Sequence, residues 1–257
     1  MICRICKSTT TQFGEALLLA KYTAKYFRCG KCGFLQTEEP YWLEEAYSEA
    51  ICRQDVGAMS RNELNAALTS GTLAMLFPQT QKALDFGGGH GVFVRMMRDR
   101  GFDFYWRDLY AANHFARGFE YDPRERYDFL TAFEVLEHFV DPMSELDVLM
   151  AASDNVFVST LTVPEPTPKL GSWWYYVPSS GQHISFYARQ TLEYIARKFG
   201  RHLQTTGAYH LLTKTPCSSV RFRLAMNPRS AKLIGRMARR PSLTPGDFEQ
   251  LTGSELQ

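Results

Sequence analysis

The most informative segment of this chain is Ala83-Leu84-Asp85-Phe86-Gly87-Gly88-Gly89-His90-Gly91-Val92-Phe93. It has the pattern of a buried strand, a glycine-rich turn and the first turn of a helix. Glycine lets the backbone turn sharply and approach a bound molecule closely, and the N-terminus of a helix carries a partial positive charge. The segment therefore predicts a ligand-binding turn at the end of a strand.

The spacing of the glycines argues against a dinucleotide ligand. Dinucleotide sites use the pattern Gly-x-Gly-x-x-Gly, with an acid about 20 residues further on. Here Gly87 and Gly89 fit, but Val92 takes the third position. Asp85 would repel a pyrophosphate, and it suits a ligand with an amino group and sugar hydroxyls. Asp108 follows 23 residues later, at the end of the next predicted strand, where a carboxylate can bind both ribose hydroxyls.

Segments of strand type alternate with helical ones from Ala83 onward. We predict strands over 82–86, 103–107, 128–133, 155–160, 203–208 and 209–214, and helices over 91–99, 143–151 and 189–199. Such alternation predicts a mostly parallel, doubly wound α/β sheet. Ahead of the sheet, apolar residues at helical spacing predict connecting helices.

Three motifs in the right order make the chain resemble the class I S-adenosylmethionine-dependent methyltransferases. They are LDFGGGHG, Asp108 after the second strand, and FEVLEHFVDP at the fourth. The resemblance covers about residues 83–214 and implies a Rossmann-like sheet that binds S-adenosylmethionine. It implies that Phe119 and Glu120 flank the adenine. The residues expected at the cofactor are Asp85, Gly87, Gly89 and Gly91 beside the methionine part, Asp108 on the ribose, and Phe133.

Glu134, Glu137 and His138 lie within five residues after the fourth predicted strand. Ligands of open α/β sheets bind at this edge. Three hypotheses stay open: a structural brace by Glu134 with His138 capping the backbone, an acid, base or substrate-contacting role for His138, or a divalent ion such as magnesium. Similar Glu-x-x-Glu-His segments bind a metal in ubiquinone-biosynthesis O-methyltransferases and small-RNA 2′-O-methyltransferases, and they also occur in relatives that need no metal. Magnesium is the least favoured hypothesis.

The long segment 163–187, which is rich in proline, glycine, serine and aromatic residues, supplies further candidates. A hydroxyl or carbon acceptor has to lose a proton, and histidine or glutamate suits that task. His183, in GQHISFY, is expected either to face the site or to cap the next helix. The predicted catalytic set is His138, His183 and Glu134. The aromatic run is expected to stack on a sugar or ring, or to plug the cofactor site; it comprises Trp173, Trp174, Tyr175 and Tyr176.

Four of the six cysteines lie in the first 32 residues, as the pairs Cys3-x-x-Cys6 and Cys29-x-x-Cys32. Two such turns can deliver four thiolates to one tetrahedral zinc ion, and a site filled by protein ligands is structural. Gly30 and Gly33 give the second turn room. Disulfides would need an oxidising compartment, which nothing in the sequence signals. We therefore predict a zinc ribbon. Cys52 and Cys217 lack the spacing of a second ligand pair and are expected to be packing residues, with Cys52 as a reserve zinc ligand.

The 257 residues carry a net charge of +2 and are 45% hydrophobic, an ordinary globular composition. The sequence has no apolar run long enough to span a membrane and no secretory signal, so a cytoplasmic location is expected. The near-neutral charge gives no general argument for a nucleic-acid partner. Residues 221–240 contain seven basic residues and no acid, which predicts a solvated helix face or contact with phosphate groups.

We expect four segments: a zinc ribbon over 1–38, connecting helices over 39–80, a methyltransferase domain over 81–215 and a basic tail over 216–257. A zinc module before such a domain resembles deoxysugar C-methyltransferases, which are longer. The favoured function is methyl transfer from S-adenosylmethionine to a small molecule, such as a sugar or polysaccharide precursor. The alternatives are RNA methylation and a non-catalytic binding protein on this fold. The sequence indicates neither the acceptor atom nor the oligomeric state.

Overall fold

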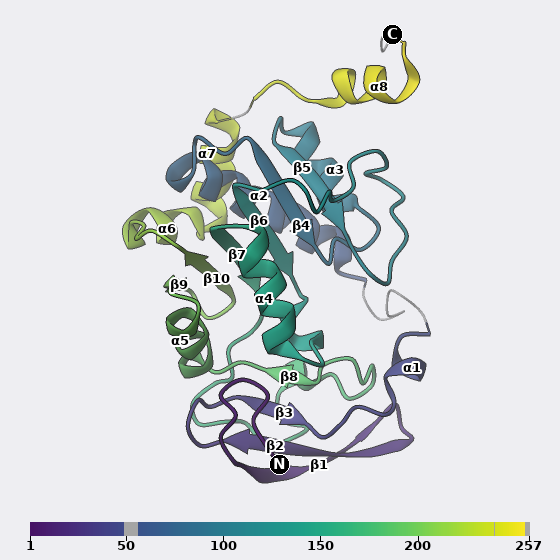
Figure 1. Ribbon diagram of the computed structural model, residues 1–257, viewed down its shortest axis with the longest axis vertical. Coiled ribbons are helices and arrows are strands. Elements are labelled where there is room, and N and C mark those ends of the chain that lie inside the picture. The colour runs from purple at the N-terminus through teal and green to yellow at the C-terminus, as the bar shows by residue number, and fades with distance from the viewer. Residues whose placement is uncertain (49–55, 239, 255–257) are drawn as a thin grey trace. The chain divides into compact units, whose positions relative to one another are not determined.

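The computed structural model describes residues 1–48, 56–238 and 240–254 (Figure 1). The chain divides into two units, each assembled from separated stretches. Unit 1 comprises Met1–Cys52, Glu134–Ala151 and Val158–Thr215, and unit 2 comprises Arg53–Phe133, Ala152–Phe157 and Pro216–Gln257. Cys52, the expected reserve ligand, lies outside the described residues.

The larger sheet has the strand order β5-β4-β6-β7-β10-β9. Strand β4 pairs in parallel with β5 and β6, and β10 pairs antiparallel with β9. The predicted doubly wound sheet is confirmed, and five of its six strands begin and end within one residue of the expected bounds. The strands are β4 (Lys82–Phe86), β5 (Asp103–Arg107), β6 (Phe129–Phe133), β7 (Asn155–Ser159), β9 (His202–Thr205) and β10 (Tyr209–Thr213).

The helices of the alternating pattern also lie where the sequence predicts them. They are α3 (Val92–Asp99), α4 (Pro142–Ala152) and α5 (Arg189–Lys198). The preceding region forms the short α1 (Leu43–Ala46) and the long α2 (Ala58–Leu76), which buries the run from Asn65 to Leu73.

The region between β5 and β6 is compressed. A single parallel bridge, Trp106 to Glu120, stands where a third strand would run beside β5. The Trp106 amide donates to the Phe119 carbonyl (2.7 Å), and the Tyr121 amide donates to the Trp106 carbonyl (2.8 Å). Residues 108–128 form no helix, so loops alone connect the bridge to its neighbours.

The N-terminal sheet of unit 1 is completed by a strand from far along the chain. Its order is β1-β2-β3-β8, and its strands are β1 (Thr10–Leu18), β2 (Tyr22–Cys29), β3 (Leu35–Thr37) and β8 (Ser185–Phe186). Its apolar face forms one cluster with the aromatic segment, in which Tyr26, Tyr175 and Tyr176 are buried. The ribbon residues therefore share their core with the segment 163–187.

The C-terminal stretch of unit 2 is helical, with α6 (Ser219–Ala225), α7 (Pro228–Met237) and α8 (Thr244–Thr252). Helix α7 approaches α2 closely, because a Cβ atom added at Gly71 would lie 3.3 Å from the Ala231 Cα. The expected tail is thus a set of packed helices. None of the helices in the described part of the chain is long and apolar enough to cross a membrane.

Candidate active site

The glycine turn after β4 needs glycine for two physical reasons. Gly87, Gly89 and Gly91 have φ angles of 71°, 52° and 88°, a left-handed region that disfavours other residues. At Gly88 the constraint is space, because a Cβ would lie 2.8 Å from Asp85 Oδ2. The turn thus keeps the backbone at Gly88 close to the Asp85 carboxylate.

Asp85 is the buried acid of this turn. Its side chain is 4% exposed, and Oδ1 accepts a 2.6 Å hydrogen bond from the Thr131 hydroxyl. Burial raises the pKa of Asp85 to about 7, although the Thr131 hydrogen bond acts in the opposite direction. Among the described residues no lysine or arginine forms an ion pair with it. A buried carboxylate without a cationic partner suits a positively charged ligand group.

Asp108 ties the turn to the loop that follows β5. Its Oδ2 accepts from the Gly89 amide (2.9 Å), and its Oδ1 accepts from the amides of Tyr110 (2.7 Å) and Ala111 (2.8 Å). The carboxylate therefore fixes the loop beside the turn. It keeps acceptor capacity for about one further donor, since an ionised carboxylate has about four lone-pair sites and three amides already bind here.

The other residues expected at the cofactor have different environments. Phe133 is half-buried, and its ring packs against Phe93 and Phe157, each at 5.3 Å. Phe119 is 2% exposed, with its ring 3.6 Å from the Arg98 guanidinium carbon. The expectation that Phe119 flanks an adenine is wrong, because cation–π packing commits its ring to the core.

Glu134, in unit 1, has the contacts of a brace. It is a non-glycine residue with φ of 54°. The Ser159 hydroxyl donates a hydrogen bond to the Glu134 carboxylate (2.6 Å), and the Glu134 amide donates to the Ser159 Oγ (2.9 Å). These two bonds hold a strained conformation and connect the segment after β6 to the end of β7.

Three side chains of unit 1 bring ligand atoms within 4.8 Å of one another: Glu137, His138 and His183. The predicted trio contained Glu134, but His183 takes its place in the structure. Glu137 is fully buried; one oxygen accepts from the Tyr175 hydroxyl, and Oε2 has no partner in the described chain. Sequence reasoning missed this grouping, because no local pattern connects residues 45 positions apart.

The environment of the two histidines keeps them neutral. Burial lowers the pKa of His138 to about 3 and that of His183 to about 4. The His183 Nδ1 lies 2.8 Å from the Tyr175 carbonyl oxygen, which can only accept, so Nδ1 carries the proton and Nε2 keeps a lone pair. The His138 Nδ1 contacts both the Tyr47 hydroxyl (2.9 Å) and the Gln182 carbonyl oxygen (3.2 Å).

Burial also changes the charge of the acid in this cluster. It raises the pKa of Glu137 to about 8, and the nearby Glu134 acts in the same direction. Glu137 is therefore mostly protonated at neutral pH when no cation is present. The cluster offers proton-accepting nitrogens and one unpartnered carboxyl oxygen, a set that suits either general-base catalysis or a divalent cation.

Three of the four aromatic residues belong to a core, so only Trp174 keeps an exposed ring for either expected role. Tyr175 and Tyr176 are buried in the core beneath the N-terminal sheet, and Trp173 packs against that core. Only Trp174 is largely exposed, at 73%. The rings thus cover the apolar face of the ribbon strands, which are too few to bury that face among themselves.

The two cysteine pairs converge. The Sγ atoms of Cys3 and Cys32 are 3.6 Å apart, those of Cys6 and Cys29 are 3.4 Å apart, and all four lie within 4.8 Å of one another. Sulfurs about 2.3 Å from a tetrahedral zinc ion would lie roughly 3.8 Å apart. The donor set and its spacing therefore fit a four-thiolate zinc site.

The backbone of the two pairs has the same form. The Lys7 amide donates to the Cys3 carbonyl and the Gly33 amide to the Cys29 carbonyl, both at 3.0 Å. Lys7 and Gly33 occupy equivalent positions, one residue after each second cysteine, with φ angles of 58° and 75°. Gly30 needs no such conformation, and a Cβ there would meet nothing within 4 Å.

Comparison with known proteins gives a family match. The family described as a methyltransferase domain matches residues 60–205, more than half of the chain. No match was found among curated protein sequences.

Solved structures that align with this chain include three methyltransferases. An O-methyltransferase family protein from Burkholderia thailandensis is 14% identical, with 66% of this chain and 61% of that one aligned at a TM-score of 0.48. Mitomycin 7-O-methyltransferase is 14% identical, with 66% of this chain and 59% of that one aligned at a TM-score of 0.45. Human N-acetylserotonin methyltransferase is 14% identical, with 69% of this chain and 67% of that one aligned at a TM-score of 0.41. This chain spans about three fifths of the length of the first two.

Proposed function

We propose that this chain, which belongs to the methyltransferase domain family, transfers the methyl group of S-adenosylmethionine to a small molecule. The observation that carries the proposal is the buried carboxylate of Asp85, which has no ion-pair partner among the described residues, beside a turn in which Gly87, Gly89 and Gly91 have positive φ angles. An acid in that place suits the amino group of the methionine part.

The proposed cofactor site lies in unit 2. Gly87, Gly89 and Gly91 leave the backbone accessible to the cofactor, and Asp85 receives its ammonium group. Asp108, already fixed by three amides, has about one lone-pair site left and accepts from a ribose hydroxyl. S-adenosylmethionine supplies a methyl group already activated by its sulfonium, so the protein acts mainly by positioning.

The proposed proton-accepting groups lie in unit 1. His183 Nε2 keeps its lone pair because Nδ1 donates to the Tyr175 carbonyl, and its lowered pKa keeps the ring neutral. A neutral imidazole can accept the proton that a hydroxyl acceptor loses. His138 stands beside it, with ring centroids 5.0 Å apart, and Glu134 braces the segment through Ser159.

A divalent cation at Glu137, His138 and His183 is the second candidate mechanism. It is favoured by the unpartnered Oε2 of the buried Glu137 and by the closeness of the three ligand atoms. Such an ion, magnesium included, would bind and polarise the acceptor oxygen. In that case the two imidazoles act as ligands instead of bases.

Two finer proposals concern the ribbon and the acceptor. Zinc in the four-cysteine site would be structural, because protein atoms fill every position. A sugar or polysaccharide precursor is the proposed acceptor, supported by the resemblance of the zinc module and methyltransferase domain to deoxysugar enzymes. RNA methylation is less favoured.

Calorimetry with S-adenosylhomocysteine tests the cofactor site first. We expect one binding site per chain, and no binding by the folded protein would refute the proposal. An acceptor screen then compares nucleotide sugars with RNA, following transfer of a labelled methyl group. Zinc analysis accompanies both experiments: about one zinc per chain, lost in Cys29→Ser and kept in Cys217→Ser, is the expected result.

A further inference from the structure

Helices α6 and α7 carry a basic surface. The basic residues Arg221, Arg223, Arg229, Lys232 and Arg236 are all exposed. No acidic residue occurs from Thr215 to Gly246. Two neighbouring helices of unit 2 thus carry five exposed basic residues with no acid among them.

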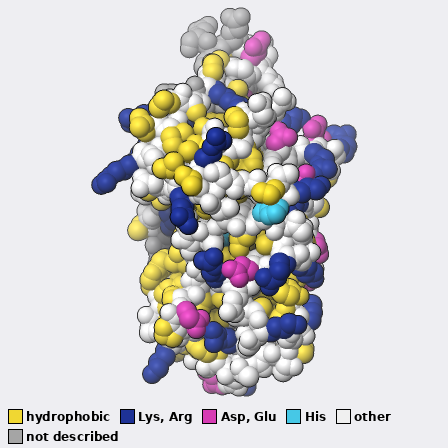
Figure 2. Space-filling view, turned by 90° about the vertical axis from the view of Figure 1, so that its left-hand side faces the viewer, with side chains coloured by type: hydrophobic (Ala, Val, Ile, Leu, Met, Phe, Trp, Pro, Cys, Tyr) yellow, Lys and Arg dark blue, Asp and Glu magenta, His cyan; other side chains and the backbone are white. Residues whose placement is uncertain are grey.

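The same surface exposes large aliphatic side chains. Val220 is 65% exposed, Leu224 47%, Leu233 61% and Met237 81%. Figure 2 shows hydrophobic and basic side chains interleaved in its upper half, over these helices. We call the four aliphatic and five basic residues together the α6–α7 face.

The packing of the helices explains why this face points outward. Helix α7 lays its small residues on α2: Ala231 lies against Gly71, and Gly235 lies against Ser70. Residues three and four apart share a side of a helix, so Leu233 and Met237 project from another side than Ala231 and Gly235. Because the inner side is already filled, the exposed aliphatic groups contribute nothing to the core of unit 2.

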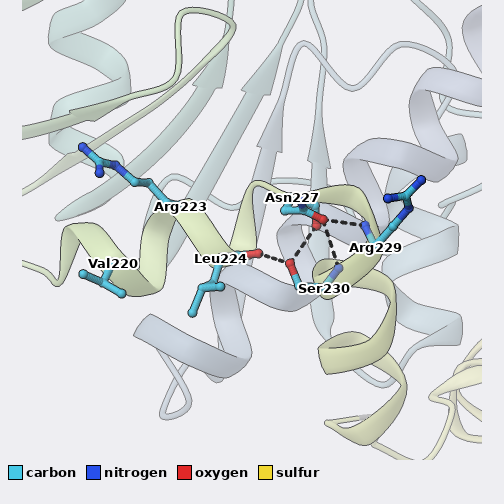
Figure 3. A pocket seen from close by; sticks show the side chains of 6 residues that line it. All are labelled: Val220, Arg223, Leu224, Asn227, Arg229 and Ser230. Carbon is cyan, nitrogen blue, oxygen red and sulfur yellow. Dashed lines mark hydrogen bonds between the residues drawn. The ribbon is translucent and has the colours of Figure 1, made fainter.

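A shallow depression of about 490 Å³ lies on this face. It is lined by Val220, Arg223, Leu224, Asn227, Arg229 and Ser230. The two guanidinium groups extend on opposite sides of Asn227 (Figure 3). Neither arginine has an acidic partner in the described part of the chain, so both can approach an external anion.

We propose that the α6–α7 face docks this protein on an anionic membrane surface. Aliphatic side chains enter the boundary between headgroups and acyl chains, while arginine and lysine attract the anionic headgroups. This face offers both kinds of group together. The inference does not depend on the methyl acceptor or on the cofactor site.

Other occupants fit the face less well. A second copy in a two-fold dimer would present the same patch, so the arginines would oppose one another. RNA would be gripped by basic side chains interleaved with aromatic ones, but the exposed apolar residues here are aliphatic. The membrane satisfies both the charge and the aliphatic groups.

Sedimentation of the full chain with vesicles tests the proposal. We expect binding to vesicles of phosphatidylglycerol and phosphatidylcholine, weakening as salt rises, and no binding to phosphatidylcholine alone. The pair Arg229→Glu and Arg236→Glu should lower the affinity about tenfold or more. The pair Leu233→Ser and Met237→Ser should also weaken binding. The binding that remains should fall more steeply with rising salt, because only the electrostatic attraction is left.

The matched control is Arg197→Glu with Lys198→Glu, which makes the same charge change on exposed residues of α5 in unit 1. It should bind vesicles like the unchanged chain. Thermal melting checks that each variant is folded. Absence of binding to the anionic vesicles, or equal loss in the control, would overturn the proposal. The proposal would also be overturned if the chain bound single-stranded RNA tightly and if its affinity for vesicles were the same with and without the Leu233 and Met237 changes.

Discussion

Two buried carboxyl groups have unusual environments at the scale of single residues. Asp85 is the fourth residue of strand β4, and Glu137 lies in the short 3-10 helix η1 (Leu136–His138). Burial raises the pKa of both groups, to about 7 and about 8. Neither has a cationic side chain beside it among the described residues. Each is therefore costly to ionise in the free protein and gains from a bound cation.

The first prediction concerns the pH dependence of cofactor binding. Below pH 7 the Asp85 carboxyl is increasingly protonated and cannot pair with the ammonium group of S-adenosylhomocysteine. We expect calorimetric affinity to fall as the pH drops from 8 to 6. The variant Asp85→Asn should lower affinity at pH 8 by about tenfold to a hundredfold, as expected for a lost charge-assisted hydrogen bond, and should flatten the pH dependence.

The stability of the same variant gives an independent check. The pKa of Asp85 is about 7 in the folded chain and about 4 in the unfolded chain. The free energy of unfolding of the ligand-free protein therefore decreases as the pH rises from about 4 to 7. Asn can still accept from Thr131. Without ligand, Asp85→Asn should therefore raise the melting temperature at pH 8 by a few degrees; a lower value would contradict the burial argument.

The second prediction distinguishes a base from a metal ligand at His183. The variant His183→Asn should lower kcat by about 10²–10⁴, the usual range for general acid–base catalysis, with no change in affinity for S-adenosylhomocysteine. Because burial lowers the pKa of His183 to about 4, the ring is neutral from pH 6 to 8, and kcat should not fall through its protonation there.

Manganese supplies the decisive control, since its paramagnetism reports binding without any turnover. If the base mechanism holds, the unchanged protein does not bind Mn²⁺ at this cluster. Binding that disappears in both His183→Asn and Glu137→Gln would instead establish the divalent-cation mechanism.

The two cysteine turns are the clearest example at the scale of elements. They repeat one backbone form, with a left-handed residue after each second cysteine, yet one turn uses glycine and the other lysine. This difference permits a matched experiment on two equivalent positions.

The third prediction compares the effect of adding a side chain at position 33 with that of removing one at position 7. The variant Gly33→Ala should destabilise the zinc-loaded protein by about 1–3 kcal/mol, because φ is 75° and the added Cβ would lie 2.9 Å from the Ala188 Cβ. The variant Lys7→Gly should stay within about 1 kcal/mol of the unchanged protein or be more stable. Urea unfolding measures both, and equal effects would contradict the strain argument.

Element boundaries could be predicted well where local sequence sets them. The strands at 82–86 and 103–107 begin and end where their apolar runs do. Strand β8 escaped prediction, because its two residues become a strand only by pairing with Leu35 and Gln36. Helices α6, α7 and α8 were expected only as a basic tail with a solvated helix face. The packing of α6 and α7 on α2 and the ion pair between Arg98 and Asp247 are invisible in a local window.

Long-range contacts decide the structure at the scale of the whole molecule. In unit 2 the Arg98 guanidinium, 5% exposed, pairs with Asp247 of α8, 149 residues away, at 2.6 Å. Asp103 and the Phe104 carbonyl accept from the same guanidinium. This network joins α3, β5 and α8, which the sequence alone leaves unconnected.

The fourth prediction removes the long-range partner from this network. The variant Asp247→Ala should lower the free energy of unfolding by about 3 kcal/mol, because it leaves a buried guanidinium with fewer acceptors. Chemical denaturation measures the change. The control Asp122→Ala removes an exposed pair with Arg124 and should leave stability unchanged. Equal stability of both variants would show that α8 is not anchored by this pair.

The sequence by itself determined the glycine turn with Asp85 and Asp108, the strand and helix pattern around it, and the cysteine pairs. These features follow from local requirements: glycine for left-handed backbone, an acid at the end of a strand, and two thiols on one turn. Only the tertiary structure decided that His183 joins Glu137 and His138, that the aromatic run covers the ribbon strands, and that Asp247 clamps Arg98. Those contacts depend on which distant apolar surfaces bury one another, and no local pattern encodes that choice.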